Sequence, residues 1–209
     1  MRFDVSSGVS VRRGFTIVEV VAAIAIIAIL GSLTLPGITR YLEAQEIDTT
    51  ESILSDLKNS IANFRATVGN SPSRLTHLTR NITSTDTTSC TGRAPATPVT
   101  LYGATNAAKW VNAGPYYSKA LSVYGFPLPI GTASDTLFRT QTSLKTAFLN
   151  ITIRFVRFQD AVKLNDAVDG SADVNQPDRS NNSGQVQWGA PSASERVDVT
   201  FGVPVGRIC

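Results

Sequence analysis

One apolar run near the start of the chain constrains its fold more than any other feature. From Phe15 to Leu35 the sequence has 21 residues, and only Glu19 among them is charged. At a rise of about 1.5 Å per residue, a helix of this length spans the roughly 30 Å hydrocarbon core of a bilayer. We therefore expect a hydrophobic transmembrane helix over residues 15–36.

The flanks of the run define its orientation. Arg12 and Arg13 directly precede it and are expected to stay in the cytoplasm, which sends the C-terminal part of the chain across the membrane. Gly14 stands before the apolar run, so a cut after it would leave that run on the mature protein, unlike a secretory signal. A carboxylate in lipid costs about 2.5–3.5 kcal/mol on insertion scales, so we expect Glu19 to have a cationic partner.

Helical periodicity continues beyond the apolar run. Pro36 is expected to kink the helix because proline removes a backbone hydrogen bond. One amphipathic face then follows at spacings of seven, three and four residues: Ile47, Leu54, Leu57, Ile61, Phe64 and Val68. Gly69 to Pro72 is typical of a helix end. We predict one kinked helix of about fifty residues; a membrane anchor followed by a separate helix is the alternative.

The remaining sequence favours an α+β fold, with the long helix packed on a small antiparallel sheet. Residues 70–115 are expected to be mainly loop, with a strand candidate at Val99–Tyr102, and Tyr116–Tyr124 is a candidate short helix. Alternating apolar residues predict three strands. Their segments are Leu149–Arg157, with Ile151, Ile153 and Phe155 on one face, Gln185–Trp188, and the segment containing Val197, Val199 and Phe201.

The two cysteines, Cys90 and Cys209, are far apart in the sequence. In an extracytoplasmic domain we expect them to form a disulfide, and two reduced thiols are the alternative. A bridge requires their Cα atoms to lie within about 7 Å of each other.

Four acidic residues in one polar stretch suggest a calcium site, because hard cations prefer several oxygen ligands. They are Asp166, Asp169, Asp173 and Asp178. Their spacing does not match the EF-hand pattern, and aspartate is also common in turns, so a turn is favoured over calcium.

Composition gives little support to an enzyme or a nucleic-acid-binding protein. The net charge is only +3, and no lysine or arginine cluster marks a recognition helix. The single histidine, His77, lacks neighbouring nucleophiles or metal ligands and is expected at the surface. There is no glycine-rich phosphate loop. We predict a protein that is not an enzyme, with no cofactor and no nucleic-acid partner.

The N-terminal pattern resembles the prepilin signature of type IV pilins and type II secretion pseudopilins. The matching features are the basic leader ending in Gly14, the segment Phe15–Val20 with Glu19 fifth after the cut, and the apolar run ending at Pro36. Tyr41 resembles an aromatic residue found in many pilins. The resemblance implies a leader over residues 1–14, a membrane or filament-core helix over 15–36, its amphipathic continuation over 37–69, and a head domain over 70–209.

The same resemblance implies a function and a set of partners. A prepilin peptidase would cut between Gly14 and Phe15 and methylate the new Phe15 amine. Mature subunits, held first by lipid in the bacterial inner membrane, would then join a periplasmic or cell-surface filament with the help of an inner-membrane assembly platform. We expect Glu19 to pair with the Phe15 amine of a neighbouring subunit, since a buried ion pair favours one stagger of the helices.

Two alternatives stay open at this point: a signal-anchored extracytoplasmic binding protein that does not assemble, and an anchored enzyme. The loop at Asp166–Gly170, followed by Ser183–Val186, is similar to an Asp-Gly loop of some prepilin-like proteins. It does not distinguish a major pilin, a minor pilin or a pseudopilin.

Overall fold

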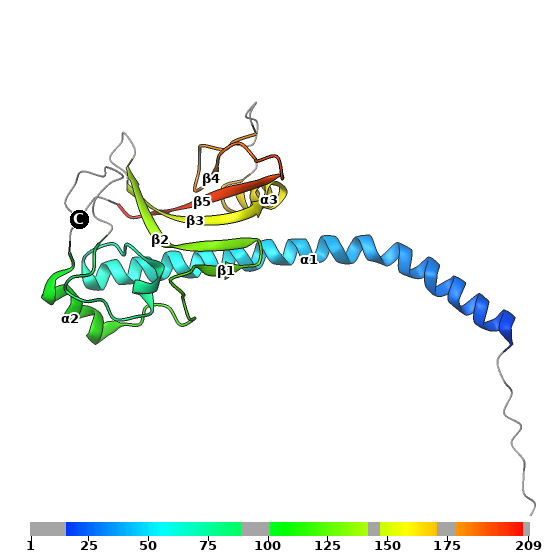
Figure 1. Cartoon of the computed structure of the whole chain (residues 1–209), viewed down its shortest axis with the longest axis horizontal. Coiled ribbons are helices and arrows are strands. Elements are labelled where there is room, and N and C mark those ends of the chain that lie inside the picture. The colour runs from blue at the N-terminus through cyan, green and yellow to red at the C-terminus, as the bar shows by residue number, and fades with distance from the viewer. Residues whose placement is uncertain (1–15, 89–100, 142–146, 171–178, 207–209) are drawn as a thin grey trace, which may run out of the picture. The chain divides into compact units, whose positions relative to one another are not determined.

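The computed structural model describes residues 16–88, 101–141, 147–170 and 179–206, with the backbone alone at 32–36 and 141. The described chain divides into two compact units, Met1–Glu43 and Ala44–Cys209, which we call the N-terminal unit and the C-terminal unit. The N-terminal unit contains the first part of one helix, and all other helices and strands belong to the C-terminal unit (Figure 1).

That helix, α1, runs without interruption from Ile17 to Val68 over 52 residues. It is therefore a single long helix, as the sequence predicts, and not an anchor followed by a separate helix. The side chain of Pro36 lies outside the described residues, and the kink at this position stays a prediction.

The C-terminal unit contains a five-stranded antiparallel sheet (Figure 1). Its spatial order is β1-β2-β3-β5-β4. The strands are β1 (Phe126–Leu128), β2 (Gly131–Gln141), β3 (Ala147–Arg157), β4 (Val186–Trp188) and β5 (Arg196–Pro204). The three strands predicted from alternation are confirmed as β3, β4 and β5. Pro127 lies in β1, at the edge of the sheet, where a missing backbone donor is tolerated.

The core lies between the last part of α1 and one face of the sheet. The helix contributes Leu54, Leu57, Ile61, Phe64 and Val68, all fully buried. The sheet contributes inward-facing residues such as Leu149, Ile151, Ile153, Val199 and Phe201. The predicted α+β arrangement, in which an amphipathic helix covers an antiparallel sheet, is confirmed.

Several elements were not predicted from the sequence. The helices α2 (Gly103–Ala113) and α3 (Phe158–Val168) and the short 3-10 helix η1 (Leu75–Leu78) lie in segments expected to be loop or left unassigned. The candidate helix at Tyr116–Tyr124 is wrong: these residues form bends and a turn, and the Tyr116 and Tyr117 amides both donate to the Leu78 carbonyl. In the strand candidate at Val99–Tyr102, Leu101 forms an isolated bridge with Thr87.

The predicted orientation of Phe155 is also wrong. Alternation places it on the buried face with Ile151 and Ile153, yet its side chain is 67% exposed. The pairing of β3 with β5 shifts between Ile153 and Val156, and Phe155 has a positive φ of 64°. A β-bulge inserts an extra residue into the strand, so the alternation restarts and Val156 takes the buried position.

Candidate functional site

The first turn of α1 is organised around Thr16. The Glu19 amide donates to the Thr16 carbonyl at 3.1 Å and to the Thr16 hydroxyl at 3.3 Å. Thr16 therefore has the position and contacts of an N-cap, and the sequence T-x-x-E matches a capping box. Gly14 and Phe15, the predicted cleavage residues and the predicted methylation site, lie outside the described residues.

Glu19 is exposed and lies in the first turn of α1. A carboxylate there interacts favourably with the positive end of the helix dipole. Together with the Thr16 cap, this gives Glu19 a structural role within its own helix, in addition to the intersubunit pairing expected from the sequence. The predicted pairing with an amine of another subunit involves a second chain and stays a prediction.

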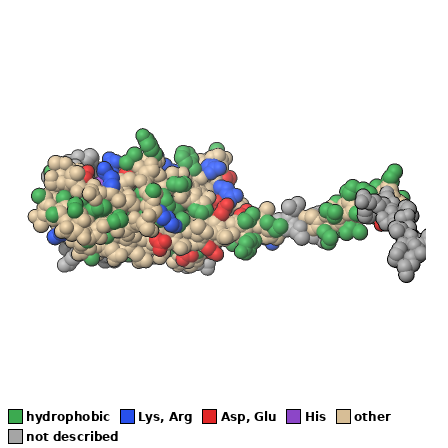
Figure 2. Space-filling view, turned by 90° about the horizontal axis from the view of Figure 1, so that it is seen from below, with side chains coloured by type: hydrophobic (Ala, Val, Ile, Leu, Met, Phe, Trp, Pro, Cys, Tyr) green, Lys and Arg blue, Asp and Glu red, His purple; other side chains and the backbone are tan. Residues whose placement is uncertain are grey.

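The apolar side chains of the N-terminal unit are exposed all round the helix. The exposed fraction is 84% for Ile17, 61% for Ile24 and 68% for Ile27. In Figure 2, groups of green hydrophobic side chains lie along the visible side of this part of α1. A helix that is apolar on every side is normally buried in a membrane or within a larger protein assembly, so these side chains need a partner outside the single chain.

The calcium candidates do not come together as a set of ligands. Asp166 lies on α3 and is exposed, while Asp173 and Asp178 lie outside the described residues. Both carboxylate oxygens of Asp169 accept backbone hydrogen bonds, from Gln185 at 2.9 Å and from Val186 at 2.8 Å. Within the described ranges, no group of three or more histidine, cysteine or acidic residues is placed to hold a metal ion.

Asp169 therefore acts as a structural link between the end of α3 and the start of β4. Gly184 belongs to the same contact, because a Cβ there would lie 2.5 Å from the Asp169 carboxylate. Its φ of 74° is also one that glycine adopts readily. A structural role in folding is therefore enough to explain the residues of the Asp-Gly loop and of the Ser183–Val186 segment.

A second support of the same loop was missed in the sequence. Asn181 is fully buried, and its side-chain amide donates to the Asn165 side chain at 2.9 Å and to the Val186 carbonyl at 2.7 Å. Arg179 lies over the Phe158 ring at 4.1 Å and forms a bidentate ion pair with Glu195. Short polar residues in a loop give little sequence signal for burial, so only a structure reveals these contacts.

His77 is not a surface residue, which corrects the expectation from the sequence. It is 1% exposed, and its Nδ1 lies 3.2 Å from the Tyr102 hydroxyl. The Trp110 indole donates to the His77 carbonyl at 2.7 Å. Burial lowers the pKa of His77 to about 4 and raises the pKa of Tyr102. A neutral, packed histidine beside a protonated tyrosine holds η1 and α2 together.

Cys90 and Cys209 both lie outside the described residues, so the disulfide stays a prediction. Among the described residues, no helix is both long and apolar enough to cross a bilayer.

The later part of α1 and the five-stranded antiparallel sheet define a pilin-like α+β arrangement, and the apolar side chains described in the N-terminal unit are exposed. Residues 10–35 match the family model described as the prokaryotic N-terminal methylation motif. This motif marks prepilin-type pilins and pseudopilins, which are generally structural proteins and not enzymes. No curated protein and no solved structure gives a significant match to the chain.

The motif implies processing by a prepilin peptidase, anchoring in the membrane and export beyond the cytoplasm. It overlaps Gly14, Phe15 and Glu19, which are the three residues that the sequence singled out for processing, methylation and assembly.

Proposed function

We propose that this protein is a structural subunit of a type IV pilus or of a pilus-like filament of a type II secretion system. The observation that supports this most is the contrast along α1. The methylation motif leads into a helix that is apolar and exposed on all sides, while the later part of the same helix packs one fully buried apolar face against a sheet. Stacking with the helices of other copies buries the first part and leaves the packed part at the surface.

Assembly begins with a cut between Gly14 and Phe15, followed by methylation of the Phe15 amine. The uncut precursor resides in the inner membrane, with its C-terminal unit outside the cytoplasm. After the cut, the helix of each subunit leaves the lipid and joins the filament in the periplasm or at the cell surface. The Cys90–Cys209 disulfide would pin the C-terminus of the exported unit.

Processing is tested by Gly14→Leu, because a bulky side chain before the cut should block the peptidase. We expect intact mass spectrometry to find only the full-length precursor in membranes of this variant. Gly8→Leu is the matched control, since it makes the same change inside the leader but away from the cut, and it should give mature chain beginning at Phe15. Mature chain from Gly14→Leu would contradict the proposed cleavage site.

The role of Glu19 is tested by three substitutions scored for surface filaments. Glu19→Gln retains the side-chain length and the capping ability of the T-x-x-E sequence but removes the charge. If Glu19 pairs with the Phe15 amine of a neighbour, both Glu19→Gln and Glu19→Ala should lose filaments while still being cut. Glu19→Asp keeps the charge on a shorter side chain and is expected to retain part of the assembly.

Normal filaments from Glu19→Gln together with loss in Glu19→Ala would show that the local cap is what matters. Normal filaments from Glu19→Ala would contradict the proposed pairing of Glu19 with the Phe15 amine of a neighbour. A chain that is cut and anchored but never assembles, in wild type as well, would favour the non-assembling binding protein over the filament subunit.

A further inference from the structure

The outer face of the sheet, which points away from the core, carries a pocket of about 350 Å³. Strand register brings its lining residues together in two rows. Phe138 of β2 lies opposite Asn150 of β3 in the first row. In the second row, Thr200 of β5 lies between Thr152 of β3 and Gln187 of β4. We call this the outer-face pocket, and its outward-facing residues are Phe138, Thr140, Asn150, Thr152, Gln187 and Thr200.

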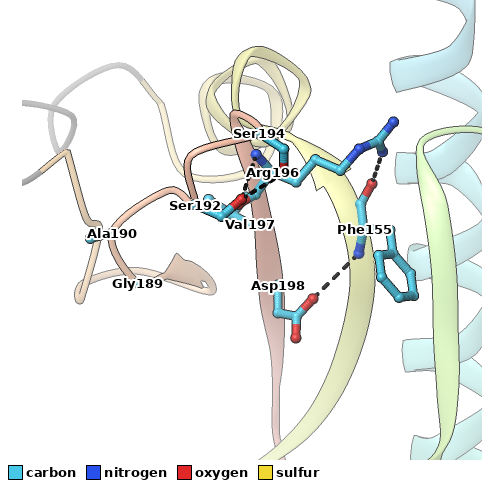
Figure 3. A pocket seen from close by; sticks show the side chains of 8 residues that line it. All are labelled: Phe155, Gly189, Ala190, Ser192, Ser194, Arg196, Val197 and Asp198. Atoms are coloured by element: carbon cyan, nitrogen blue, oxygen red, sulfur yellow. Dashed lines mark hydrogen bonds between the residues drawn. The ribbon is translucent and has the colours of Figure 1, made fainter.

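A second hollow, beside the bulge in β3, has polar residues that folding already uses. Figure 3 shows the Arg196 guanidinium and the Asp198 carboxylate bound to the carbonyl and the amide of Phe155. The Ser192 hydroxyl there binds the Arg196 backbone. These bonds hold the bulge and the loop before β5, so the residues of this hollow need no ligand to explain them.

The outer-face pocket differs because several of its polar groups are left over after folding. The hydroxyls of Thr152 and Thr200 have no hydrogen-bond partner among the described residues. The Asn150 side-chain amide donates to the Thr140 hydroxyl at 3.1 Å, and that of Gln187 donates to the backbone carbonyl three residues before it at 2.9 Å. Each bond fixes an amide group and leaves its carbonyl oxygen as an acceptor. Four half-buried polar groups on rigid strands are therefore available to a ligand.

The charge of the pocket restricts what it can bind. None of its six outward-facing side chains ionises. Arg139 also borders the pocket, but it belongs to the core-facing row of β2 and is only 5% exposed. A charged ligand would lose its hydration here without gaining an opposite charge. The pocket therefore favours an uncharged ligand with an apolar surface for the Phe138 ring, which is 53% exposed, and with groups that both donate and accept hydrogen bonds.

Sugars have this combination of properties. One face of a hexose ring carries mainly C–H bonds and packs against an aromatic ring, while its edge carries hydroxyls that donate and accept hydrogen bonds. A peptide is a poorer match, because peptides that extend a sheet bind at its edge, whereas this pocket lies on a face and includes the central strand β3. The volume is near the lower end of the range for ligand sites, about 300–1,000 Å³, and suits a short stretch of sugar units.

We propose that the outer-face pocket binds a neutral polysaccharide through one or two of its sugar units. Phe138 packs on the face of a sugar ring. The hydroxyls of Thr152 and Thr200 and the carbonyl oxygens of Asn150 and Gln187 bind the hydroxyl groups of the sugar. This binding activity goes beyond the proposed filament function and does not depend on it, since every residue involved lies in the C-terminal unit.

The first test measures binding of oligosaccharides to the full chain in a zwitterionic detergent, because detergents with sugar headgroups would compete. The neutral ligands are maltohexaose, cellohexaose, chitohexaose and mannohexaose. Hexagalacturonic acid is the anionic ligand, and a pool of random hexapeptides represents peptides. Saturation-transfer NMR and calorimetry should show a Kd of about 1 mM or lower for at least one neutral ligand. No binding by any neutral ligand, or tighter binding of the acid or the peptides, would overturn the proposal.

The second test removes the aromatic ring. Phe138→Ala should weaken binding of the neutral ligand about tenfold, because the sugar face loses its apolar contact. Phe155→Ala is the matched control, since Phe155 is another exposed phenylalanine of the sheet, at 67%, and lies outside the pocket. Its affinity should equal that of the wild type. Equal affinities in the two variants would contradict a binding site at Phe138.

The third test removes single hydroxyls. Thr152→Val and Thr200→Val keep the shape and the β-propensity of the side chain, and each should weaken binding about fivefold. Thr132→Val makes the same change at an exposed position of β2 outside the pocket and should have no effect. Wild-type affinity in both pocket variants, at an unchanged melting temperature, would overturn the proposed hydrogen bonds.

The outcomes for binding and for assembly are separate. Saccharide binding by a chain that never forms filaments would leave the pocket standing and end the proposed function. Filaments from a chain that binds no neutral saccharide would do the reverse.

Discussion

Both ends of α1 carry large apolar side chains, but these side chains have opposite surroundings. In the N-terminal unit Ile27 is 68% exposed, whereas Phe64, 37 residues later in the same helix, is fully buried. Phe64 makes edge-to-face contacts with Tyr102 and Tyr116, at ring-centroid distances of 5.9 and 5.2 Å. The last part of the helix is buried against apolar partners of the C-terminal unit, whereas the described apolar side chains of the first part are exposed.

The difference lies in the distribution of apolar residues around the helix. In the C-terminal unit they form one stripe, and polar residues such as Asp56 and Asn63 occupy the other side. In the N-terminal unit they surround the helix. A stripe needs one partner, which the sheet supplies, but a helix that is apolar all round needs an environment on every side, such as lipid or other helices.

The largest effect should come from Phe64→Ala. Removing a fully buried phenylalanine leaves a cavity and should lower the free energy of unfolding by about 3–5 kcal/mol. Ile27→Ala is the counterpart in the N-terminal unit and should change it by less than about 0.5 kcal/mol. Denaturant unfolding of the full chain in detergent, followed by tryptophan fluorescence, measures both. A large loss of unfolding free energy in Ile27→Ala would contradict this difference between the two ends of α1.

The sequence predicted those parts of the fold where apolar residues alternate or recur regularly. The long helix and β3, β4 and β5 were found this way. β2 was missed because two of its inward positions are polar: Asp135 and Arg139 are 4% and 5% exposed and alternate with the apolar positions Ala133 and Leu137. α3 was missed because it buries only a few residues, among them Ala161 and Leu164, which is too short a pattern to recognise.

In the candidate site too, local patterns were recognised in the sequence and long-range contacts were missed. The processing motif is a local pattern and was found in the sequence. Phe155 was assigned to the wrong face because a bulge cannot be read from alternation, and His77 was placed at the surface because its partners, Tyr102 and Trp110, lie 25 and 33 residues away. Long-range polar contacts leave no periodic signal.

An effect of intermediate size on the free energy of unfolding is expected from protonation of His77. This effect concerns the C-terminal unit alone. Burial lowers the pKa of His77 from 6.5 to about 4. Between these values the unfolded chain binds the proton and the folded chain does not, so stability falls as the pH is lowered from about 6.5 to 4. The loss should reach on the order of 3 kcal/mol at the lower end of this window.

The measurement is the difference between wild type and His77→Asn across this pH range, because carboxylates titrate in both proteins and cancel. Asparagine keeps a polar atom near the position of Nδ1, which contacts Tyr102. The variant should be less stable at pH 7, and the gap should narrow toward pH 4. A constant gap would show that His77 is not held neutral by its surroundings.

The smallest effect should come from Thr16→Ala, and it is confined to the N-terminal unit. The Thr16 hydroxyl accepts a hydrogen bond from the Glu19 amide. Losing an N-cap side chain lowers helix stability by about 1 kcal/mol. Since the described side chains of the first turn are exposed, this cost should appear as faster hydrogen exchange of the amides at residues 17–20, with no change in unfolding of the C-terminal unit. Thr16→Ser retains the hydroxyl, so its amides should exchange at the same rate as those of the wild type.

Slower exchange in the alanine variant, or equal exchange in all three proteins, would show that the cap does not hold the turn that presents Glu19. In assembled filaments the three proteins should converge, because packing against other copies would then protect these amides more strongly than the cap does.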